Sequence, residues 1–208
     1  MRVSDLSRSS GVPVATIKYY LREGLLPRGE TTSPNQARYD DAHIRRLRLI
    51  RALVEVGGLP IATVREVLSA VDDPAVGLHD MLGRTVYAIT GDVGASGSLD
   101  EAEADLAGAM AHVGWQVEKD APALAGARSV LARMHELGWG PGEETLRAWA
   151  EAADRAAEGD LAAIGRTTDR EEAAETALVG TVLGDALLAA LRRIAQESRS
   201  AQRYRAGS

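Results

Sequence analysis

Apolar residues recur at helical spacing along most of the chain, and short polar segments divide them into separate helices. The first helix begins near Ser4 with Leu6 facing inward, and Gly11 supplies a turn. Pro13 opens a second helix that ends near Arg22. The inward stripe of this second helix consists of Val14, Ile17 and Leu21. Two short helices joined by a tight turn therefore begin the chain.

A loop and two further helices follow. Residues 26–37, LPRGETTSPNQA, have no helical period and predict a loop or a two-stranded wing. Asp40 or Asp41 caps the next helix, Gly57-Gly58 ends it, and Pro60 opens a shorter helix. The apolar stripe of the longer helix consists of Ile44, Leu47, Ile50 and Val54. Its arginines, which we expect to face mostly outward, are Arg45, Arg46, Arg48 and Arg51.

The remaining chain is also predicted to be helical. A helix is expected through Tyr87, and the Gly/Ser-rich residues 91–98 follow as a flexible joint. Four further helices are predicted at about 99–117, 121–137, 142–164 and 170–200. We expect a mainly α fold: a winged helix-turn-helix followed by an all-helical domain. The predicted divisions are a DNA-binding domain at 1–73, a connecting helix and joint at 74–98, and an effector-binding and dimerisation domain at 99–208.

The last predicted helix is apolar on more than one side. One stripe consists of Val179, Leu183, Leu187, Leu191 and Ile194, and a second consists of Leu178, Val182 and Leu188. The core of a single chain accounts for one apolar face, so the second face indicates a homodimer. The residues expected in the dimer interface are Leu178, Val179, Val182, Leu183, Leu187 and Leu191.

Charge is distributed unevenly along the chain. The formal net charge is -6, yet residues 1–70 hold 11 Lys and Arg against 7 Asp and Glu, a balance of +4. Residues 71–208 hold 13 against 23, a balance of -10. A basic head and an acidic body are the asymmetry expected of a DNA-binding domain joined to a regulatory domain.

The composition also excludes several classes of function. The chain has no cysteine, so disulfides, thiolate metal sites and thiol redox sensors are excluded. No histidine has a convincing nucleophile partner and no phosphate-binding glycine loop appears, so we expect neither an enzyme nor a cofactor. We expect no metal site, because His112 and His135 lack a repeated carboxylate–histidine spacing. The most apolar segment, Leu178–Leu191, is too short to span a bilayer and contains Asp185. A cytoplasmic protein without a membrane partner is therefore expected.

The order of helix, turn, helix, wing, arginine-rich helix and short helix resembles the N-terminal domain of the MerR family of transcription regulators. The resemblance covers about the first 70 residues. The residues that carry it are Gly11-Val12, Thr16-Ile17-Lys18-Tyr19-Tyr20, Gly24-Leu25-Leu26-Pro27, Tyr39-Asp40, Arg46-Leu47-Arg48-Leu49-Ile50 and Gly58-Leu59-Pro60-Ile61. It implies that the second helix enters the major groove of double-stranded promoter DNA and that the wing contacts the neighbouring backbone.

The resemblance also implies which residues bind DNA. The positions that would meet base edges or phosphates are Thr16, Lys18, Tyr19, Arg22, Arg38, Tyr39, Arg45 and Arg48. Family members commonly carry Gly-Tyr-Arg-x-Tyr on the wing, whereas residues 35–39 of this chain are Asn-Gln-Ala-Arg-Tyr. The arginine is therefore displaced by one residue, to Arg38.

Bulky polarizable side chains are few in the acidic body. The candidates for a ligand pocket are Met110, Trp115, Met134, Trp139 and Trp149. In a small-residue helical domain such side chains most often form the core, and the alternative is the lining of a ligand cavity. The all-helical, alanine-rich pattern is similar to the ligand-binding half of tetracycline-repressor-like regulators. Without cysteine, soft metals such as Hg and Cu(I) are removed as ligands, which leaves a small organic effector.

Together these features predict a homodimeric transcription regulator that recognises an inverted-repeat promoter site and responds to a small organic ligand. The resemblance implies that it distorts promoter DNA so that RNA polymerase can engage both promoter elements. Simple repression is equally compatible. Two other classes stay open: an architectural DNA-binding protein without a ligand, and a drug-sequestering protein that controls its own gene. A cavity or a solid core in the C-terminal domain would discriminate between them.

Overall fold

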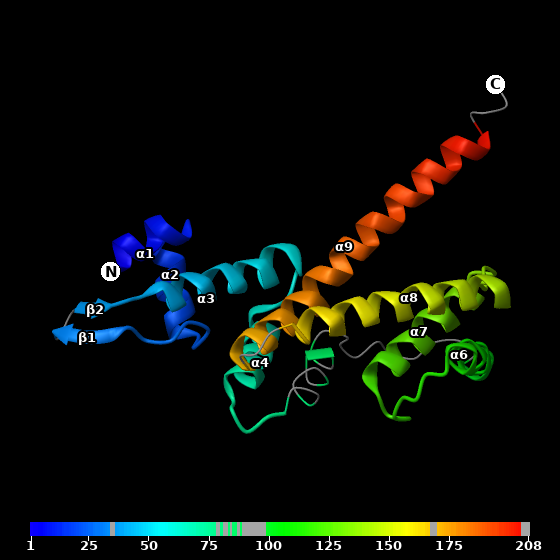
Figure 1. Cartoon of the computed structure of the whole chain (residues 1–208), viewed down its shortest axis with the longest axis horizontal. Coiled ribbons are helices and arrows are strands. Elements are labelled where there is room, and N and C mark those ends of the chain that lie inside the picture. The colour runs from blue at the N-terminus through cyan, green and yellow to red at the C-terminus, as the bar shows by residue number, and fades with distance from the viewer. Residues whose placement is uncertain are drawn as a thin grey trace. The chain divides into compact units, whose positions relative to one another are not determined.

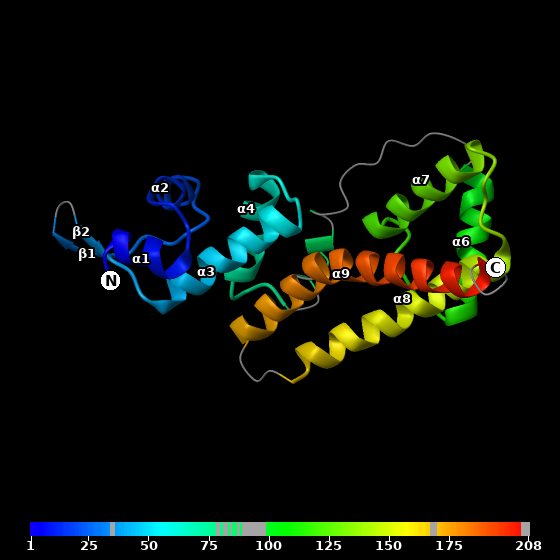
Figure 2. The same cartoon turned by 90° about the horizontal axis from the view of Figure 1, so that it is seen from above.

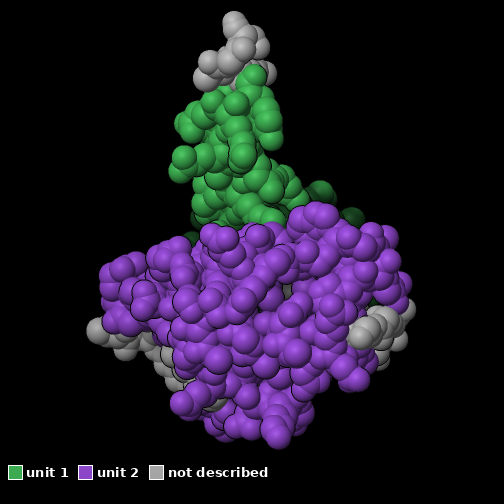
Figure 3. All heavy atoms as spheres, turned by 90° about the vertical axis from the view of Figure 1, so that its right-hand side faces the viewer, with its two compact units in different colours: residues 1–73, 178–208 green, residues 74–177 purple. Residues whose placement is uncertain are grey.

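The computed structural model of the protein describes residues 1–33, 36–77, 80, 83, 85, 86, 88, 99–166 and 170–204. The chain divides into two compact units, coloured separately in Figure 3. Unit 1 consists of residues 1–73 and 178–208, and unit 2 consists of residues 74–177. The described residues are mainly helical and include a two-stranded sheet, which confirms the predicted fold class (Figure 1).

Unit 1 begins with the head, defined here as residues 1–73. Its elements are α1 (Val3–Ser10), α2 (Val14–Arg22), β1 (Glu30–Ser33), β2 (Gln36–Arg38), α3 (Asp41–Arg51), the π-helical turn η1 (Ala52–Val56) and α4 (Ile61–Asp72). These helices and η1 all contribute to one buried core. Its fully buried side chains include Leu6, Val12, Ile17, Leu25, Leu26, Leu47, Ile50, Leu53, Val64 and Leu68. Burying each such side chain contributes about 1.5–3 kcal/mol before the entropy cost of folding is counted.

Strands β1 and β2 form an antiparallel hairpin, which projects from the head as a wing (Figure 1). Glu30 lies opposite Arg38 and Thr31 opposite Ala37, and the register shifts between Thr31 and Ser33. The expected loop or wing at 26–37 is therefore a wing. At its base, a Cβ atom on Gly29 would overlap the Arg38 carbonyl, so glycine allows the two strands to approach closely.

The long helix α9 (Arg170–Tyr204) supplies residues to both units. Its residues from Leu178 onward belong to unit 1, where Leu178 and Val182 are buried. A Cβ atom on Gly57, at the end of η1, would overlap the Val182 side chain. The sequence division placed all of 99–208 in one domain, but this packing groups the greater part of α9 with the head.

Unit 2 contains α6 (Leu99–Val113), α7 (Pro122–Glu136) and α8 (Glu143–Ile164), at about the predicted positions (Figure 2). Helix α6 contacts both α7 and α8. A small core of Ala102, Leu131 and Ala132 holds them together. Leu106, Met134 and Leu146 pack against this core and are partly buried. The predicted joint at 91–98 lies outside the described residues.

Helix α9 is longer than the apolar segment seen in the sequence. It runs for 35 residues, and by length and composition its described part from Glu172 to Tyr204 could cross a membrane. The core helix of a soluble protein passes the same test, and Leu178 and Val182 are packed inside unit 1. The segment Leu178–Leu191 is therefore part of a longer helix. The sequence-based argument that this segment is too short to span a bilayer was wrong.

Candidate nucleic-acid interface

The turn between α1 and α2 is fixed by glycine and by serine hydroxyl groups. Gly11 has a φ of 71°, a left-handed conformation that glycine adopts without strain. The Ser10 hydroxyl donates to the Leu6 carbonyl at 2.7 Å, and the Val12 N–H donates to the same hydroxyl at 3.3 Å. The Ser7 hydroxyl donates to the Val12 carbonyl at 2.6 Å. These local bonds set the direction in which α2 leaves the turn.

The outward side of α2 carries the residues predicted to meet DNA. Lys18 and Arg22 are exposed, Thr16 and Tyr19 are half-buried, and Ile17 anchors the opposite side in the core. The Arg22 guanidinium carbon lies 5.8 Å from the centroid of the Tyr19 ring, which is cation–π geometry. Lys18 has no ion-pair partner among the residues that the structure describes. This face therefore presents positive charge to solvent.

Two of the residues predicted to bind DNA lie at the end of the wing. Arg38 is exposed on β2 without an ion-pair partner in the described part of the chain, and Tyr39 is half-buried. The Tyr39 ring meets the His43 imidazole edge to face at 5.1 Å. The displaced arginine of the sequence pattern therefore projects to solvent, while the tyrosine packs at the junction with α3.

The four arginines of α3 divide into two kinds. Arg45 and Arg48 are exposed and have no carboxylate partner among the described residues. Arg46, by contrast, is buried: its guanidinium bonds both Asp72 carboxylate oxygens, at 2.9 and 2.5 Å, and its Nε donates to the Leu25 carbonyl at 3.0 Å. The expectation that Arg46 faces outward was therefore wrong. Its long side chain reaches into the domain and links α3 to α4.

Two further arginines of the head are also paired. Arg51 makes two hydrogen bonds of 2.9 Å to Glu55, and these bonds hold the pKa of the Glu55 carboxyl below its ordinary value. Arg65 on α4 pairs with the Glu23 carboxylate and donates to the Glu23 carbonyl at 2.8 Å. A helical period marks such arginines as surface charges, and both do lie at the surface, where each is neutralised by a carboxylate of the head.

One exposed cation was missed at the sequence level. Arg28 lies in the loop between α2 and the wing, is exposed, and has no ion-pair partner in the described part of the chain. Its position directly after Pro27 and before the wing was the available signal. The head's cations that lack a carboxylate partner within the described ranges include Lys18, Arg22, Arg28, Arg38, Arg45 and Arg48.

The candidate ligand residues all lie in unit 2: Met110, Trp115, Met134, Trp139 and Trp149. The structure brings the rings of Trp139 and Trp149 together, with centroids 6.3 Å apart and planes tilted by 31°. Trp139 is 57% exposed. The Trp115 indole N–H donates to the Asp154 carboxylate at 2.7 Å, and Met134 packs on the small core. Trp139 is therefore the exposed member of this set, whereas Met110, Trp115, Met134 and Trp149 are half-buried.

The candidate dimer residues divide by burial. Leu178 and Val182 are buried within the chain, so they are not free to contact a partner, and Leu183 is half-buried. The exposed large aliphatic residues of α9 are Val179, Leu187, Leu188, Leu191 and Ile194. The surface available to a second copy is therefore narrower than the sequence indicated, and it extends further along the helix.

Comparison with known proteins identifies the head. The family model described as "MerR HTH family regulatory protein" matches residues 1–71. The "Mercuric resistance operon regulatory protein" of Bacillus cereus is 31% identical over 88 residues, 42% of this chain and 66% of that protein. The "HTH-type transcriptional regulator ZntR homolog" of Haemophilus influenzae is 38% identical over 50 residues, 24% of this chain and 37% of that protein. The chain therefore spans less than two thirds of these curated relatives.

A solved structure covers nearly the whole chain. It is the crystal structure of SCO5550, a proposed transcriptional regulator from Streptomyces coelicolor A3(2), with a TM-score of 0.73 and 35% sequence identity. The match covers 98% of each chain, so the likeness extends beyond the head into the helices that follow it. These similarities show that residues 1–71 are a helix-turn-helix domain of the MerR family and that the chain is a transcription regulator of MerR type.

Proposed function

We propose that the protein is a cytoplasmic, non-enzymatic transcription regulator that binds promoter DNA through α2, the wing and α3. The observation that supports this most directly is the division of the head's cations. Arg46, Arg51 and Arg65 are held by carboxylates, whereas Lys18, Arg38 and their unpaired neighbours face solvent. Unpaired, solvated cations release counterions from DNA when they meet phosphates, and this release drives association.

Replacing the exposed lysine of α2 tests the placement of that helix. Lys18→Ala should weaken binding to a duplex that the wild-type protein has selected from a random-sequence pool, with an unchanged circular dichroism spectrum. The control is Lys119→Ala, the same substitution at an exposed position of unit 2, which should leave the dissociation constant unchanged. Equal affinity of both variants and wild type would remove α2 from the DNA interface.

The protein is proposed to form a homodimer in which the α9 helices of two copies pack against each other. Leu187, Leu191 and Ile194 are all exposed, and their spacing of four and three residues is that of a coiled-coil seam. Burying this stripe against a second copy would remove apolar surface from water on both helices. Two heads related by a two-fold axis would then recognise the two halves of an inverted repeat.

Regulation is proposed to act through the shape of the promoter. Membership in the MerR family supports activation by distortion, in which bound DNA is twisted so that RNA polymerase engages both promoter elements. Simple repression uses the same contacts without the distortion. In vitro transcription with and without the protein distinguishes the two modes, because activation raises transcript yield and repression lowers it.

Unit 2 is proposed to bind a small organic effector that is apolar or amphipathic. The Trp139–Trp149 pair supports this assignment, since Trp139 is exposed and neighbouring indoles provide a face for flat or cationic molecules. The negative charge of residues 71–208 disfavours anions. Binding should change tryptophan emission and raise the melting temperature with ligand concentration. The likeness to tetracycline-repressor-like regulators stays a prediction.

A second candidate function is architectural DNA binding without an effector. The small alanine and leucine core of α6–α8 favours it, because closely packed small residues leave little space between helices. Absence of a tryptophan response to a broad panel of lipophilic compounds would support this alternative. A drug-sequestering protein would instead bind such a compound while its DNA affinity stayed the same.

A further inference from the structure

Two arginines from other helices bind the backbone where α2 ends. The Arg65 Nε on α4 donates to the Glu23 carbonyl at 2.8 Å, and the same guanidinium pairs with the Glu23 carboxylate. The Arg46 Nε on α3 donates to the Leu25 carbonyl at 3.0 Å. Glu23 is the C-cap residue of α2, so a cation there also lies at the negative end of the helix dipole. Side chains of two other helices therefore hold the end of α2.

The Glu23 carbonyl receives its hydrogen bond from outside the local turn. The last carbonyls of a helix lack partners within the helix, and a tight turn satisfies some of them. Here Gly24, with a φ of 72°, turns the chain so that the Leu25 N–H donates to the Tyr20 carbonyl at 3.0 Å. The donor to Glu23, by contrast, comes from Arg65, 42 residues further along the chain. This bond therefore attaches the end of α2 to α4.

Arginine is suited to this attachment, because its planar fork can bond a carbonyl and a carboxylate at the same time. The pair lies at the surface: the Arg65 side chain is 47% exposed and that of Glu23 is 32% exposed. Such pairs contribute little to global stability, so removing this one should leave the head folded. The direction of α2 is more sensitive, because its last turn carries Arg22, which is exposed on the face predicted to meet DNA.

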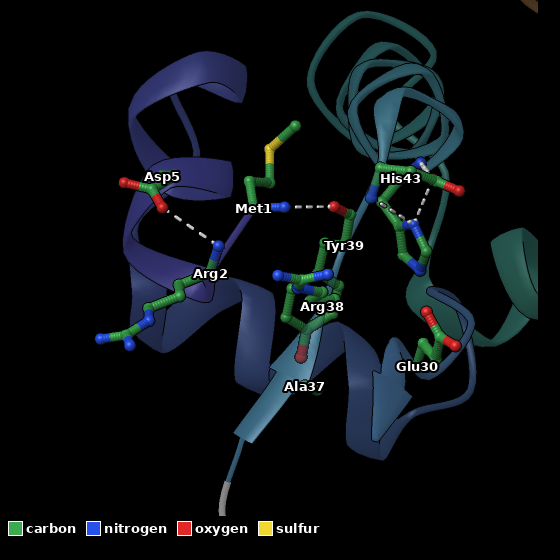
Figure 4. A pocket seen from close by; sticks show the side chains of 9 residues that line it. Met1, Arg2, Asp5, Glu30, Ala37, Arg38, Tyr39 and His43 are labelled. Atoms are coloured by element: carbon green, nitrogen blue, oxygen red, sulfur yellow. Dashed lines mark hydrogen bonds and ion pairs between the residues drawn. The ribbon is translucent and has the colours of Figure 1, made fainter. Parts of the chain in front are cut away.

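The wing is fixed by a different set of contacts. The Tyr39 N–H donates to the Met1 carbonyl at 2.9 Å, and the Met1 amino group donates to the Tyr39 carbonyl at 2.7 Å (Figure 4). At the start of α3, the Asp40 carboxylate accepts the His43 backbone N–H at 3.2 Å. All four residues line a polar cleft of about 730 Å³, and Arg65 is not part of its lining. A change at Arg65 therefore leaves the anchor of the wing in place.

We propose that Arg65 is a positioning residue for DNA binding, which acts by holding the C-terminal end of α2 through Glu23. It makes no contact with DNA itself. Without this link the last turn of α2 can shift, and its side chains no longer meet the base edges in register. Contacts to phosphates tolerate such a shift better than contacts to base edges, because phosphates carry no sequence information. The inference rests on the proposed function, since it requires α2 to contact DNA.

The test measures affinity for two duplexes by fluorescence anisotropy at several salt concentrations. One duplex is selected by the wild-type protein from a random-sequence pool, and the other is an unselected duplex of equal length. Arg65→Ala should bind the selected duplex about two- to thirtyfold more weakly, with an unchanged salt slope. Its affinity for the unselected duplex and its melting temperature should stay close to the wild-type values. A merely structural role would lower the melting temperature and weaken binding to both duplexes.

A second pair of variants separates positioning from charge. Arg65→Ala also uncovers the Glu23 carboxylate, so Arg65→Ala/Glu23→Gln is compared with Glu23→Gln alone, in which the backbone carbonyl keeps its donor. The loss for the selected duplex should persist in this comparison. Arg65→Lys should recover only part of the affinity, because an ammonium group lacks the fork. Arg133→Ala removes an exposed arginine that is paired with Glu136 in unit 2, and it should change neither affinity.

Three results would overturn the inference while leaving the proposed function intact. They are an unchanged affinity of Arg65→Ala for the selected duplex, full recovery of that affinity in the double variant, and a salt slope reduced by about 1, which would make Arg65 a phosphate contact. Failure of the wild-type protein to bind any duplex, or to select one from the pool, would instead overturn the proposed function as well.

Discussion

Arg46 and Asp72 form a two-pronged ion pair that joins the middle of α3 to the last residue of α4, at 2.9 and 2.5 Å. The Arg46 side chain is only 10% exposed, whereas that of Asp72 is 55% exposed. The buried guanidinium also binds the Leu25 carbonyl, shortly after the end of α2. One side chain thus ties together three segments that lie far apart in the sequence, and it orients α2 relative to α3.

Removing the Arg46 side chain should destabilise the head without removing a DNA contact. Arg46→Ala leaves the Leu25 carbonyl without its donor and creates a cavity, so the free energy of unfolding should fall by about 1–3 kcal/mol. Arg48→Ala is the matched control at an exposed, unpaired position and should change stability by less than about 0.5 kcal/mol. Urea denaturation followed by circular dichroism measures both. Equal stabilities would show that the ion pair contributes nothing to the fold.

Exposed and paired arginines of α3 should also differ in their effect on DNA binding. Arg48→Ala should reduce the slope of log affinity against log salt concentration by about 1, as expected for one lost phosphate contact. Arg51→Ala removes an arginine that is bound to Glu55 and should leave the slope nearly unchanged. Titrations at several salt concentrations give the slopes. A reduced slope in Arg51→Ala alone would reverse the assignment.

Gly57 should tolerate no side chain. A methyl group there would overlap Val182 and approach the Leu53 carbonyl at 2.7 Å, so Gly57→Ala should lower the melting temperature. Combining it with Val182→Ala removes the first overlap but not the second, and part of the loss should be recovered. The four melting temperatures form a double-mutant cycle. If the two single substitutions lowered the melting temperature by amounts that simply add in the double variant, α9 would not pack on the end of η1 in solution.

A charge on the exposed stripe of α9 should dissociate the dimer. Leu191→Asp would place an unpaired carboxylate in an apolar seam, at a cost of several kcal/mol. Light scattering should give a dimer for wild type and a monomer for this variant. Ala189→Asp adds the same charge at an exposed position two residues away, on the opposite side of the helix, and it should leave the dimer intact. Wild-type protein that is monomeric at micromolar concentration would contradict the interpretation of the stripe.

Lowering the pH should reduce the folding stability of the head, partly because the Glu55 carboxylate becomes protonated. Its hydrogen bonds to Arg51 lower its folded pKa, so its contribution to stability is present above the ordinary pKa of glutamate, about 4.3, and is lost as the pH falls through the folded value. The melting-temperature difference between wild type and Glu55→Gln should therefore shrink to zero in strong acid. Glu66→Gln changes an exposed glutamate that has no ion pair in the described ranges, and it should not show this trend.

Sequence patterns predicted the positions of the helices and the wing in the head well. They did not predict which of its arginine side chains are buried in ion pairs. Pro13, Gly57-Gly58 and Pro60 lie at helix ends because proline and glycine restrict or free the backbone locally, whatever the rest of the fold does. Arg46 was misplaced because its partners, Leu25 and Asp72, are more than 20 residues away along the chain. Such partners are set by tertiary packing, which a helical period does not contain.

Tertiary packing also determines which apolar residues of α9 are buried and which are exposed, and the sequence pattern did not predict this. Leu178 and Val182 belong to the same run of apolar residues as Leu187 and Leu191, so the pattern could not separate the residues that pack inside the chain from those that stay exposed. The close packing of Val182 against Gly57 is what buries this part of α9, and, within the described ranges, the residues further along the helix have no such contact with the head.

The alanine-rich core of α6–α8 has a consequence for how the molecule opens. Ala102 and Ala132 bury far less apolar surface than the leucines and isoleucines that fill the head. Local unfolding free energy follows buried contacts, so backbone amides of α6–α8 should exchange with deuterium sooner than those around Leu47 and Ile50. A molecule that slows exchange in α6–α8 while leaving the head unchanged would thereby be identified as a ligand of unit 2, and a change in DNA affinity on its addition would identify it as the effector.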